Sequence, residues 1–493
     1  MKDLKEKTIR GGYARGGALA STFILRVVSL MLLARLLDPK DFGLIGMVTA
    51  FTGILSLFRD FGLSAAAVQR SYVSEEQTST LFWINILVGA LLMVVAMLSA
   101  PLVARFYHEP RLFWITTVVA TSFLFNGLGI QHSAILQRQM RFTTLAIIDV
   151  LSLIIGTLIA LLAARAGYGY WALVAMTVSV PLVSTLGFWM TSAWRPGKPH
   201  RGVGMRSMMR FGGALTLNGL IMYIASNFEK VLLGRYWGAE ALGLYGRAYQ
   251  LIRIPTDNLN TAVGDVAFSA LARTQDDSVR LKRYFLKGYS LVLALTIPIT
   301  IACALFADDI VFVLLGPKWK QAAQIFRLLA PTMLVFAICN PIGWLLTSVG
   351  MVGRGLKIAF VIAPLMIASN IIGLPYGPKG VAIAFSTVTL LWMIPIIPWG
   401  VHDTVISTWD VVRTVSRPLA SVIPAAGLAF AIVLFVGATV TPLVRLVIET
   451  AVLFSAYAAI LLFVAGQKSF YFDLLRAMRG SPAVEKQDAV STL

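Results

Sequence analysis

Two arginines, Arg26 and Arg253, lie deep inside apolar segments that are each long enough to cross a lipid bilayer. An arginine at such a depth costs about 2.5–3.5 kcal/mol on insertion, so it normally faces the interior of a helix bundle or a water-filled cavity. Arg253 shares a helical face with Tyr249 and Asn260, and Arg26 shares one with Ser29. Because the planar guanidinium group donates paired hydrogen bonds to phosphate, we predict that the two arginines bind a phosphate-bearing anion.

Carboxylates offer a structural explanation for the same arginines. Asp257 follows Arg253 by four residues and would neutralise it on the same helical face, and Arg26 could likewise pair with an acid on another helix. Glu229 and Lys230 are neighbours on one helix and therefore point in different directions. At least one of them should line a cavity, and Glu229 is also a candidate for binding a coupling proton.

Four further charged residues are candidates for gating. Arg59 and Asp60 lie near the end of an apolar segment beside Gly62, which suggests a local hinge or a gating salt bridge. Asp149 and Asp265 lie inside apolar segments and have no obvious partner in the sequence. Both lining of a cavity and pairing with a neighbouring helix remain open for these two carboxylates.

Polar and aromatic residues complete the candidate site. Tyr245 and Tyr249 are candidates for stacking on sugar rings, and Arg247 lies nearer the outer end of its segment. Asn218 shares a helical face with Glu229. The candidate substrate-binding residues are Arg26, Arg247, Arg253, Asn218, Tyr245, Tyr249 and Asn260. The candidate gating or coupling residues are Arg59, Asp60, Asp149, Glu229, Lys230, Asp257 and Asp265.

No combination of residues in the sequence indicates covalent catalysis or a metal centre. The two cysteines, Cys303 and Cys339, lie far apart in apolar segments and form no CxxC motif. No two of the four histidines share a helical turn, so no metal-binding cluster is expected. No nucleophile, base and orienting group come together in the sequence. We therefore expect neither an enzyme nor a bound cofactor.

Membrane-spanning helices must position these residues. The sequence is 58% hydrophobic and 13% charged, whereas soluble domains contain about a quarter charged residues. A spanning helix needs about 20 mostly apolar residues, which predicts an all-α integral membrane protein with about fourteen spans. The predicted spans are 14–36, 42–66, 80–104, 112–135, 143–164, 169–191, 211–236, 242–271, 284–306, 322–348, 356–376, 380–402, 416–437 and 443–465.

The distribution of positive charge predicts the orientation. The net charge is +19, and Lys and Arg gather in alternate loops, as they do on the cytoplasmic side of inner-membrane proteins. This pattern places both termini in the cytoplasm. No basic stripe lies on a soluble module, so nucleic-acid binding is not expected.

An internal repeat divides the chain into two lobes. Residues 211–215 echo residues 15–19, and residues 242–246 echo residues 42–46. Six predicted helices separate the copies, so both halves enter the membrane in the same direction, as a parallel repeat around a central site requires. The predicted parts are a cytoplasmic N-terminus (1–13), an N-lobe (14–191), a cytoplasmic inter-lobe loop (192–210), a C-lobe (211–402), a linker with an extra helix pair (403–465) and a cytoplasmic tail (466–493).

Several short motifs carry a resemblance to a known family. These are LARLLDPKDFGL (33–44) and DFGLSAA (60–66) in the first half, with GLY (243–245), RAY (247–249) and GDVAF (264–268) in the second. The chain resembles the Wzx-type lipopolysaccharide and exopolysaccharide flippases of the polysaccharide transporter family. That family has a MATE-like fold within the MOP superfamily, and the resemblance points to its colanic acid and teichuronic acid exporter branch.

The resemblance implies a flippase of the bacterial inner (plasma) membrane. Its substrate would be an oligosaccharide repeat unit on undecaprenyl pyrophosphate, moved from the cytoplasmic to the periplasmic leaflet by alternating access for exopolysaccharide, O-antigen or capsule biosynthesis. Expected partners are this lipid-linked oligosaccharide, membrane lipids and the polysaccharide polymerase or export machinery. In relatives with fourteen helices the last pair can form a groove for the lipid tail, and residues 416–465 are the candidates for that role.

Two other functions compete. A MATE-type multidrug or cation antiporter would bind Na⁺ or H⁺ with acidic residues in the first-lobe cavity, whereas the first helix here carries Arg26 and no carboxylate. A membrane polysaccharide polymerase or ligase would place catalytic residues in a large external loop, which the sequence does not predict. The sugar composition, the oligomeric state and the energy source (proton, sodium or membrane potential) stay open.

Overall fold

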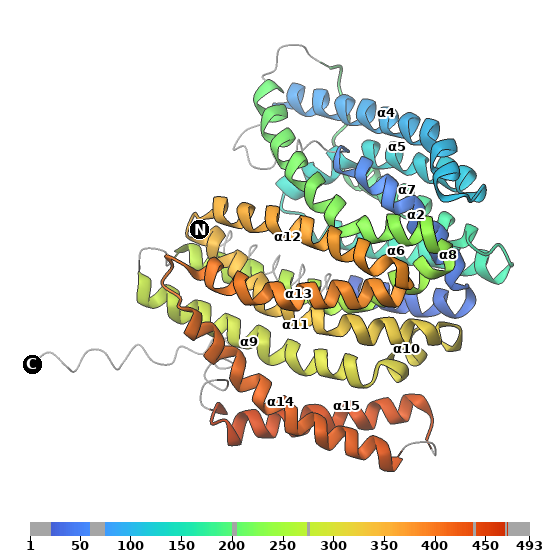
Figure 1. Cartoon of the computed structure of the whole chain (residues 1–493). Helices are drawn as coiled ribbons and strands as arrows, with labels where there is room; N and C mark the ends of the chain where they lie inside the picture. The colour runs from blue at the N-terminus through green and yellow to red at the C-terminus, as the bar shows by residue number, and fades with distance from the viewer. Residues whose placement is uncertain are drawn as a thin grey trace, which may run out of the picture. The chain divides into compact units, whose positions relative to one another are not determined.

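The computed structural model describes residues 21–59, 74–199, 205–273, 277–436, 440–468 and 471, and within these ranges it contains helices and turns but no strand (Figure 1). The first half consists of a helix at residues 21–36 and of α2 (Pro39–Leu57), α4 (Glu75–Tyr107), α5 (Arg111–Arg138), α6 (Phe142–Arg165) and α7 (Trp171–Thr191). The second half begins with the long helix α8 (Met205–Arg273). It continues with α9 (Ser278–Leu305), α10 (Ala307–Leu315), the 3-10 turn η1 (Pro317–Trp319), α11 (Lys320–Ser348), α12 (Val352–Gly373), the 3-10 turn η2 (Leu374–Tyr376), α13 (Gly377–Val401), α14 (Thr408–Val436), α15 (Pro442–Ala459) and a π-helical turn (Ile460–Val464).

The described residues contain ten candidate membrane spans, so the chain is a multi-pass membrane protein. One of these spans, Gly353–Val401, runs through both α12 and α13, which η2 and Gly377 (φ 72°) separate. The long helix α8 is likewise broken at Gly238, whose φ is 80°. Both breaks fall where the sequence predicts one span to end and the next to begin. The total of about fourteen spans and the cytoplasmic location of the termini remain predictions.

Local capping chemistry fixes several helix starts. At the start of α4, the backbone N–H of Gln77 donates to Ser74 Oγ at 3.2 Å, and the backbone N–H of Ser74 donates to Gln77 Oε1 at 3.2 Å. This reciprocal pair is a capping box. At the start of α9, Asp277 Oδ1 accepts hydrogen bonds from the backbone N–H groups of Val279 and Arg280. Polar residues ahead of the apolar segments therefore set where these helices begin.

Two elements differ from the sequence prediction. The helix α2 ends at Leu57, ahead of the predicted end at residue 66, and the stretch from residue 60 to 73 lies outside the described residues. The helix α10 lies between the predicted spans 284–306 and 322–348, where the sequence predicts no helix. It is apolar but only nine residues long, which corresponds to about 14 Å. A search for membrane-spanning segments overlooks a helix of this length.

The chain packs into two compact units. Unit 1 consists of Met1–Arg247, Leu314–Lys320 and Ala363–Val381. Unit 2 consists of Ala248–Val313, Gln321–Ile362 and Ala382–Leu493. The two-lobe boundaries deduced from the repeat stay a prediction.

In unit 1, α2 and α8 touch backbone to backbone. A Cβ atom on Gly43 would lie 1.6 Å from the carbonyl oxygen of Ala239, and one on Gly243 would lie 1.8 Å from that of Pro39. Only glycine allows two helices to approach this closely. The contact is reciprocal, and it joins the two motifs that the internal repeat makes equivalent, residues 42–46 and 242–246.

The turn η1 packs against the same part of unit 1. Trp319 is fully buried, its Nε1–H donates to the carbonyl oxygen of Ala34 at 2.8 Å, and its ring meets Phe42 edge-on at 5.3 Å. Next to it, Lys318 Nζ lies 2.8 Å from Asp38 Oδ1. We call these five residues the outer cluster, because the predicted topology places them on the external side.

In unit 2, the helices α9, α11, α14 and α15 share one hydrophobic core. Near its centre Tyr289 of α9 is buried, stacks on Phe285 with ring centroids 5.5 Å apart, and donates from its hydroxyl to the carbonyl oxygen of Ile338 at 3.2 Å. The helices α14 and α15 lie side by side and pack on α9 (Figure 1). The extra helix pair is thus joined to the second half of the chain through apolar packing.

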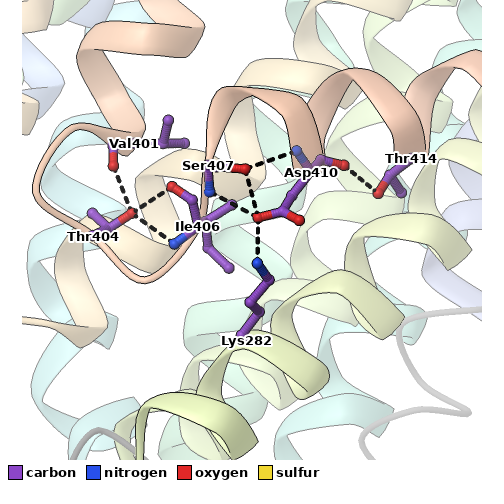
Figure 2. Close-up of polar contacts among 7 residues, drawn as sticks. All are labelled: Lys282, Val401, Thr404, Ile406, Ser407, Asp410 and Thr414. Carbon is purple, nitrogen blue, oxygen red and sulfur yellow. Dashed lines mark hydrogen bonds and ion pairs between the residues drawn. The ribbon is translucent and has the colours of Figure 1, made fainter.

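Polar contacts attach this helix pair at both ends. Figure 2 shows Lys282 of α9 pointing at Asp410 of α14, with Nζ 2.6 Å from Oδ2. The same carboxylate oxygen accepts from the backbone N–H of Ser407 at 2.9 Å and from its hydroxyl at 2.8 Å, which caps the start of α14. At the other end, Arg445 Nε of α15 donates to Asp309 Oδ2 of α10 at 2.7 Å. Two ion pairs therefore fasten the pair to α9 and its continuation α10.

Candidate functional site

Arg26 lies on a helix that exposes two different faces. The helix at residues 21–36 exposes apolar side chains at four-residue spacing, as a lipid-facing surface does. These residues are Ile24, Val28, Leu32 and Leu36. Arg26 is exposed as well, but at 100° per residue it lies about 160–200° around the helix from Ile24 and Val28. Its charge therefore points away from the lipid-facing stripe.

Asp149 has the same arrangement on α6. The exposed apolar stripe of this helix consists of Ile147, Leu151, Ile155, Leu158 and Leu162. Asp149 is exposed, yet it lies about 160–200° from Ile147 and Leu151. It shares the opposite side of α6 with Gly156 and Ala160, which are buried. The carboxylate is therefore exposed on the side of α6 that otherwise packs against protein.

Arg26 and Asp149 belong to one set of polar residues. Arg26 acts on Asp149 by electrostatic attraction, and farther along the two helices the hydroxyl of Thr157 donates to Ser29 Oγ at 3.1 Å. Within the ranges that the structure describes, neither Arg26 nor Asp149 takes part in a salt bridge. We call these four residues the polar seam. Arg26 and Asp149 therefore attract each other without forming a salt bridge.

Glu229 and Lys230 have different surroundings on α8, as neighbours on a helix must. Glu229 is buried, with 5% of its surface exposed. Lys230 is partly exposed and donates from Nζ to Asn227 Oδ1 at 2.6 Å. Two turns earlier, the hydroxyl of Tyr223 donates to the carbonyl oxygen of Thr49 at 2.9 Å and ties α8 to α2. The roles predicted for Glu229 and Lys230 in coupling stay predictions.

Arg247 and Tyr245 lie where α8 meets α2. The guanidinium carbon of Arg247 is 4.5 Å from the centroid of the Phe42 ring, which places Arg247 beside the outer cluster. Tyr245 is 1% exposed, so protein encloses its ring in this structure. Binding of substrate by these two residues stays a prediction.

In unit 2, Arg253 is held by aromatic rings. Its guanidinium carbon lies 5.9 Å from the centroid of Tyr249 and 5.6 Å from that of Phe336 on α11, and Tyr249 meets Phe385 of α13 edge-on at 6.0 Å. We call these four residues the Arg253 cluster. Aromatic faces attract a guanidinium group, whose N–H groups donate hydrogen bonds in its own plane. The two rings therefore help to fix the orientation of the Arg253 side chain. Binding of substrate by Arg253 stays a prediction.

Several predicted site residues lie outside the description. They are Asp60, which falls in the gap from 60 to 73, and Asn218, Asp257, Asn260 and Asp265, whose side chains are not described. Arg59 follows the end of α2, and its Nε is buried without a hydrogen-bond partner among the described residues. The hinge or gating salt bridge predicted for Arg59 and Asp60 stays a prediction.

The structure adds residues that sequence reasoning missed. Phe336 and Phe385 contribute to the Arg253 cluster, and Thr157 contributes to the polar seam. No motif marks them, since each is a common residue type in an apolar segment. Among the described residues, no group of three His, Cys, Asp or Glu side chains is placed to hold a metal ion.

Comparison with known proteins places the chain in a family. Residues 32–324, more than half of the chain, match the family model described as polysaccharide biosynthesis protein. The chain is 31% identical over 334 residues to the teichuronic acid biosynthesis protein TuaB of Bacillus subtilis (strain 168), covering 66% of this chain and 68% of that protein. It is 27% identical over 397 residues to the lipopolysaccharide biosynthesis protein WzxC of Escherichia coli (strain K12), covering 79% and 80%.

Solved structures show the same fold. The lipid II flippase MurJ, in an inward closed conformation, has a TM-score of 0.73 at 14% identity and covers 94% of this chain and 99% of that one. An inward-facing MATE family multidrug resistance transporter of the MOP superfamily has a TM-score of 0.64 at 13% identity, covering 82% and 99%. The MATE-like fold and the family resemblance predicted from the sequence are confirmed. The chain therefore belongs to the polysaccharide biosynthesis protein family of multi-pass membrane proteins.

Proposed function

We propose that this protein is a flippase that carries an oligosaccharide repeat unit on undecaprenyl pyrophosphate from the cytoplasmic to the periplasmic leaflet of a bacterial inner membrane. The polar head crosses by alternating access while the lipid tail stays in hydrocarbon. The observation that carries the proposal is the orientation of Arg26, which is exposed inside a spanning helix but faces away from the lipid-facing stripe. The names of TuaB, WzxC and MurJ support a role in polysaccharide synthesis and in lipid translocation.

The position of Arg26 argues for water at this depth. Ten residues separate it from the described end of its helix at residue 36, a distance of about 15 Å along the axis. An exposed charge so far from the head groups is stable only in a hydrated space, because lipid would impose the insertion cost of an unsolvated ion. We therefore expect a water-filled chamber beside the polar seam.

The charges of the polar seam suit a transported anion. Asp149 attracts Arg26 but forms no salt bridge with it, so the arginine keeps hydrogen-bonding capacity for a phosphate group. A site on a transport path must bind tightly enough to admit the substrate and weakly enough to release it. Partial compensation by a nearby carboxylate meets both conditions.

Arg253 supplies a second cation for a substrate that carries two phosphates. Its cluster orients the guanidinium group against Tyr249 and Phe336. Aromatic rings beside a cation also suit a sugar–phosphate junction, since sugars stack on aromatic faces. In this proposal Arg26 and Arg253 act on the same head group at different stages of its passage.

We further propose that the protein performs no covalent chemistry and that a polymerase or export system uses the translocated unit. Purified protein in vesicles containing a fluorescent undecaprenyl-pyrophosphate oligosaccharide tests this. Transport is read as loss of fluorescence to a membrane-impermeant quencher, and mass spectrometry shows whether the lipid is chemically unchanged. A change in its mass would indicate the polymerase or ligase alternative.

Charge reversal tests the two arginines. The double variant R26E/R253E should abolish transport and weaken binding of the lipid substrate, while R165Q, which removes an exposed arginine at the end of α6, should behave as the wild type. If the double variant transported and bound normally, the proposed path would be wrong. Accumulation of a fluorescent organic cation on an imposed ion gradient, without lipid movement, would support the antiporter alternative instead.

A further inference from the structure

A pocket of about 470 Å³ opens in unit 2 at the turn between α11 and α12. Its lining consists of Met351, Gly353, Arg354, Lys357 and Trp399. The volume lies within the range of small-molecule sites in proteins, about 300–1,000 Å³. Since α11 ends at Ser348 and α13 ends at Val401, the pocket lies at the ends of spanning helices, which the predicted topology places on the cytoplasmic side.

Arg354 is fixed at the rim of the pocket. Its guanidinium group donates to the backbone carbonyl of His402 and to Asp403 Oδ2, the latter at 3.2 Å. The hydrogen bond from the His402 side chain, together with that from Arg354, holds the pKa of Asp403 below its usual value, so this carboxylate is ionised. Arg354 has five N–H donors, and its two partners leave others for a ligand.

Lys357 adds a charge that nothing nearby compensates. It is exposed, one turn along α12 from Arg354, and within the described residues it forms no ion pair. None of the described residues that line the pocket carries a carboxylate. The pocket also lies at the N-terminal end of α12, where the helix dipole favours an anion. Each of these features attracts negative charge.

The wall of the pocket is apolar. Met351 and Trp399 pack against a buried cluster formed by Ile342, Leu346 and Ile396, among others. A tryptophan at the end of a spanning helix lies at the level of the lipid head groups. An apolar wall beside a cationic rim suits an amphiphile with a phosphate head better than a small soluble anion.

We infer that this pocket binds the phosphate group of a membrane lipid at the cytoplasmic surface. The guanidinium group of Arg354 and the ammonium group of Lys357 hold the phosphate, while Met351 and Trp399 contact the glycerol or prenyl carbons next to it. This site is separate from the polar seam and the Arg253 cluster, and the inference does not depend on transport.

Lipid titration of the purified full-length chain tests the inference. Phosphatidylglycerol is added stepwise to the protein in a neutral detergent, and bound lipids are counted by native mass spectrometry. The variant K357Q should bind phosphatidylglycerol about fivefold more weakly than the wild type, because one cation near the lipid surface is lost. The matched control is K379Q, which removes an exposed lysine at the start of α13 and should bind as the wild type does.

Four probes define which phosphate-bearing molecules the pocket binds. Phosphatidylglycerol and an undecaprenyl diphosphate without sugar should both bind in a manner that depends on Lys357, and phosphatidylcholine should bind more weakly than either. Saturation by inorganic phosphate alone, with no effect of K357Q on lipid binding, would overturn the inference. Equal loss of binding in K357Q and K379Q would also overturn it, since that result indicates general attraction between the protein and anionic lipid.

Discussion

Replacing Gly243 with alanine should separate α2 from α8 at their reciprocal glycine contact. The new Cβ atom would lie 1.8 Å from the carbonyl oxygen of Pro39, whereas a carbon–oxygen contact needs about 3.3 Å. The two backbones must therefore move apart by about 1.5 Å. Because the obstructing atom belongs to the backbone, a change of side-chain rotamer cannot relieve the overlap.

Two measurements would detect this displacement, namely thermal unfolding and chemical cross-linking. Overpacking of this kind costs about 1–3 kcal/mol, so the temperature of thermal unfolding should fall. The second measurement uses a variant in which Cys303 and Cys339 are replaced by alanine, and Asp38 and Lys318 by cysteine. Cross-linking of the two new cysteines measures whether α2 and η1 stay close, because the native side chains at these positions are in contact. Cross-linking of this pair by a short reagent should slow in the Gly243→Ala background.

Gly246→Ala is the matched control. It lies one turn along the same helix, and a Cβ atom there would meet no atom within 4 Å. Alanine should leave cross-linking unchanged and stabilise the helix by up to about 1 kcal/mol. If Gly243→Ala and Gly246→Ala unfolded at the same temperature and cross-linked at the same rate, the close approach of the two backbones would be refuted.

Three further predictions concern single contacts. Trp319→Phe keeps a ring but loses the hydrogen bond to Ala34, so thermal unfolding should show a loss of about 1 kcal/mol, and an unchanged transition would contradict that bond. Lys318→Gln should change stability by less than about 1 kcal/mol, because its ion pair is exposed; a larger loss would show that the pair is shielded from solvent. Asp410→Ala removes a helix cap and the partner of Lys282 together, so it should cost about 1–2 kcal/mol and speed proteolysis at the α13–α14 turn. Wild-type cleavage rates there would argue against the attachment.

The sequence was sufficient to predict most of the helices. Apolar length is a strong signal because a bilayer requires about 20 apolar residues per span, and the helices α5, α6 and α7 begin and end within three residues of the predicted spans. Gly238 and Gly377 interrupt the helical backbone at the positions where one predicted span ends and the next begins. Both have positive φ values that other residues rarely adopt.

The contacts that shape the candidate site could not be predicted in the same way. Arg26 was identified by its depth, but the orientation of its face became clear only from the exposure of its neighbours. Phe336 and Phe385 meet Arg253 and Tyr249 across large sequence separations, and such contacts depend on how helices are rotated against each other. The sequence identifies the motif that contains Gly43 as one copy of a repeat. It does not predict that the backbone of this motif packs directly against the backbone of α8, because residue types alone do not say which helices are neighbours.

The two ion pairs on the α14–α15 hairpin have a mechanical consequence. Lys282 and Asp309 stand 27 positions apart along α9 and α10, which corresponds to about 40 Å of helix. A helix hairpin that is attached at two points this far apart cannot rotate about one ion pair while the other ion pair stays formed. Because Lys282 lies near the start of α9 and Asp309 near the start of α10, any movement of the α14–α15 hairpin would have to carry both helices with it.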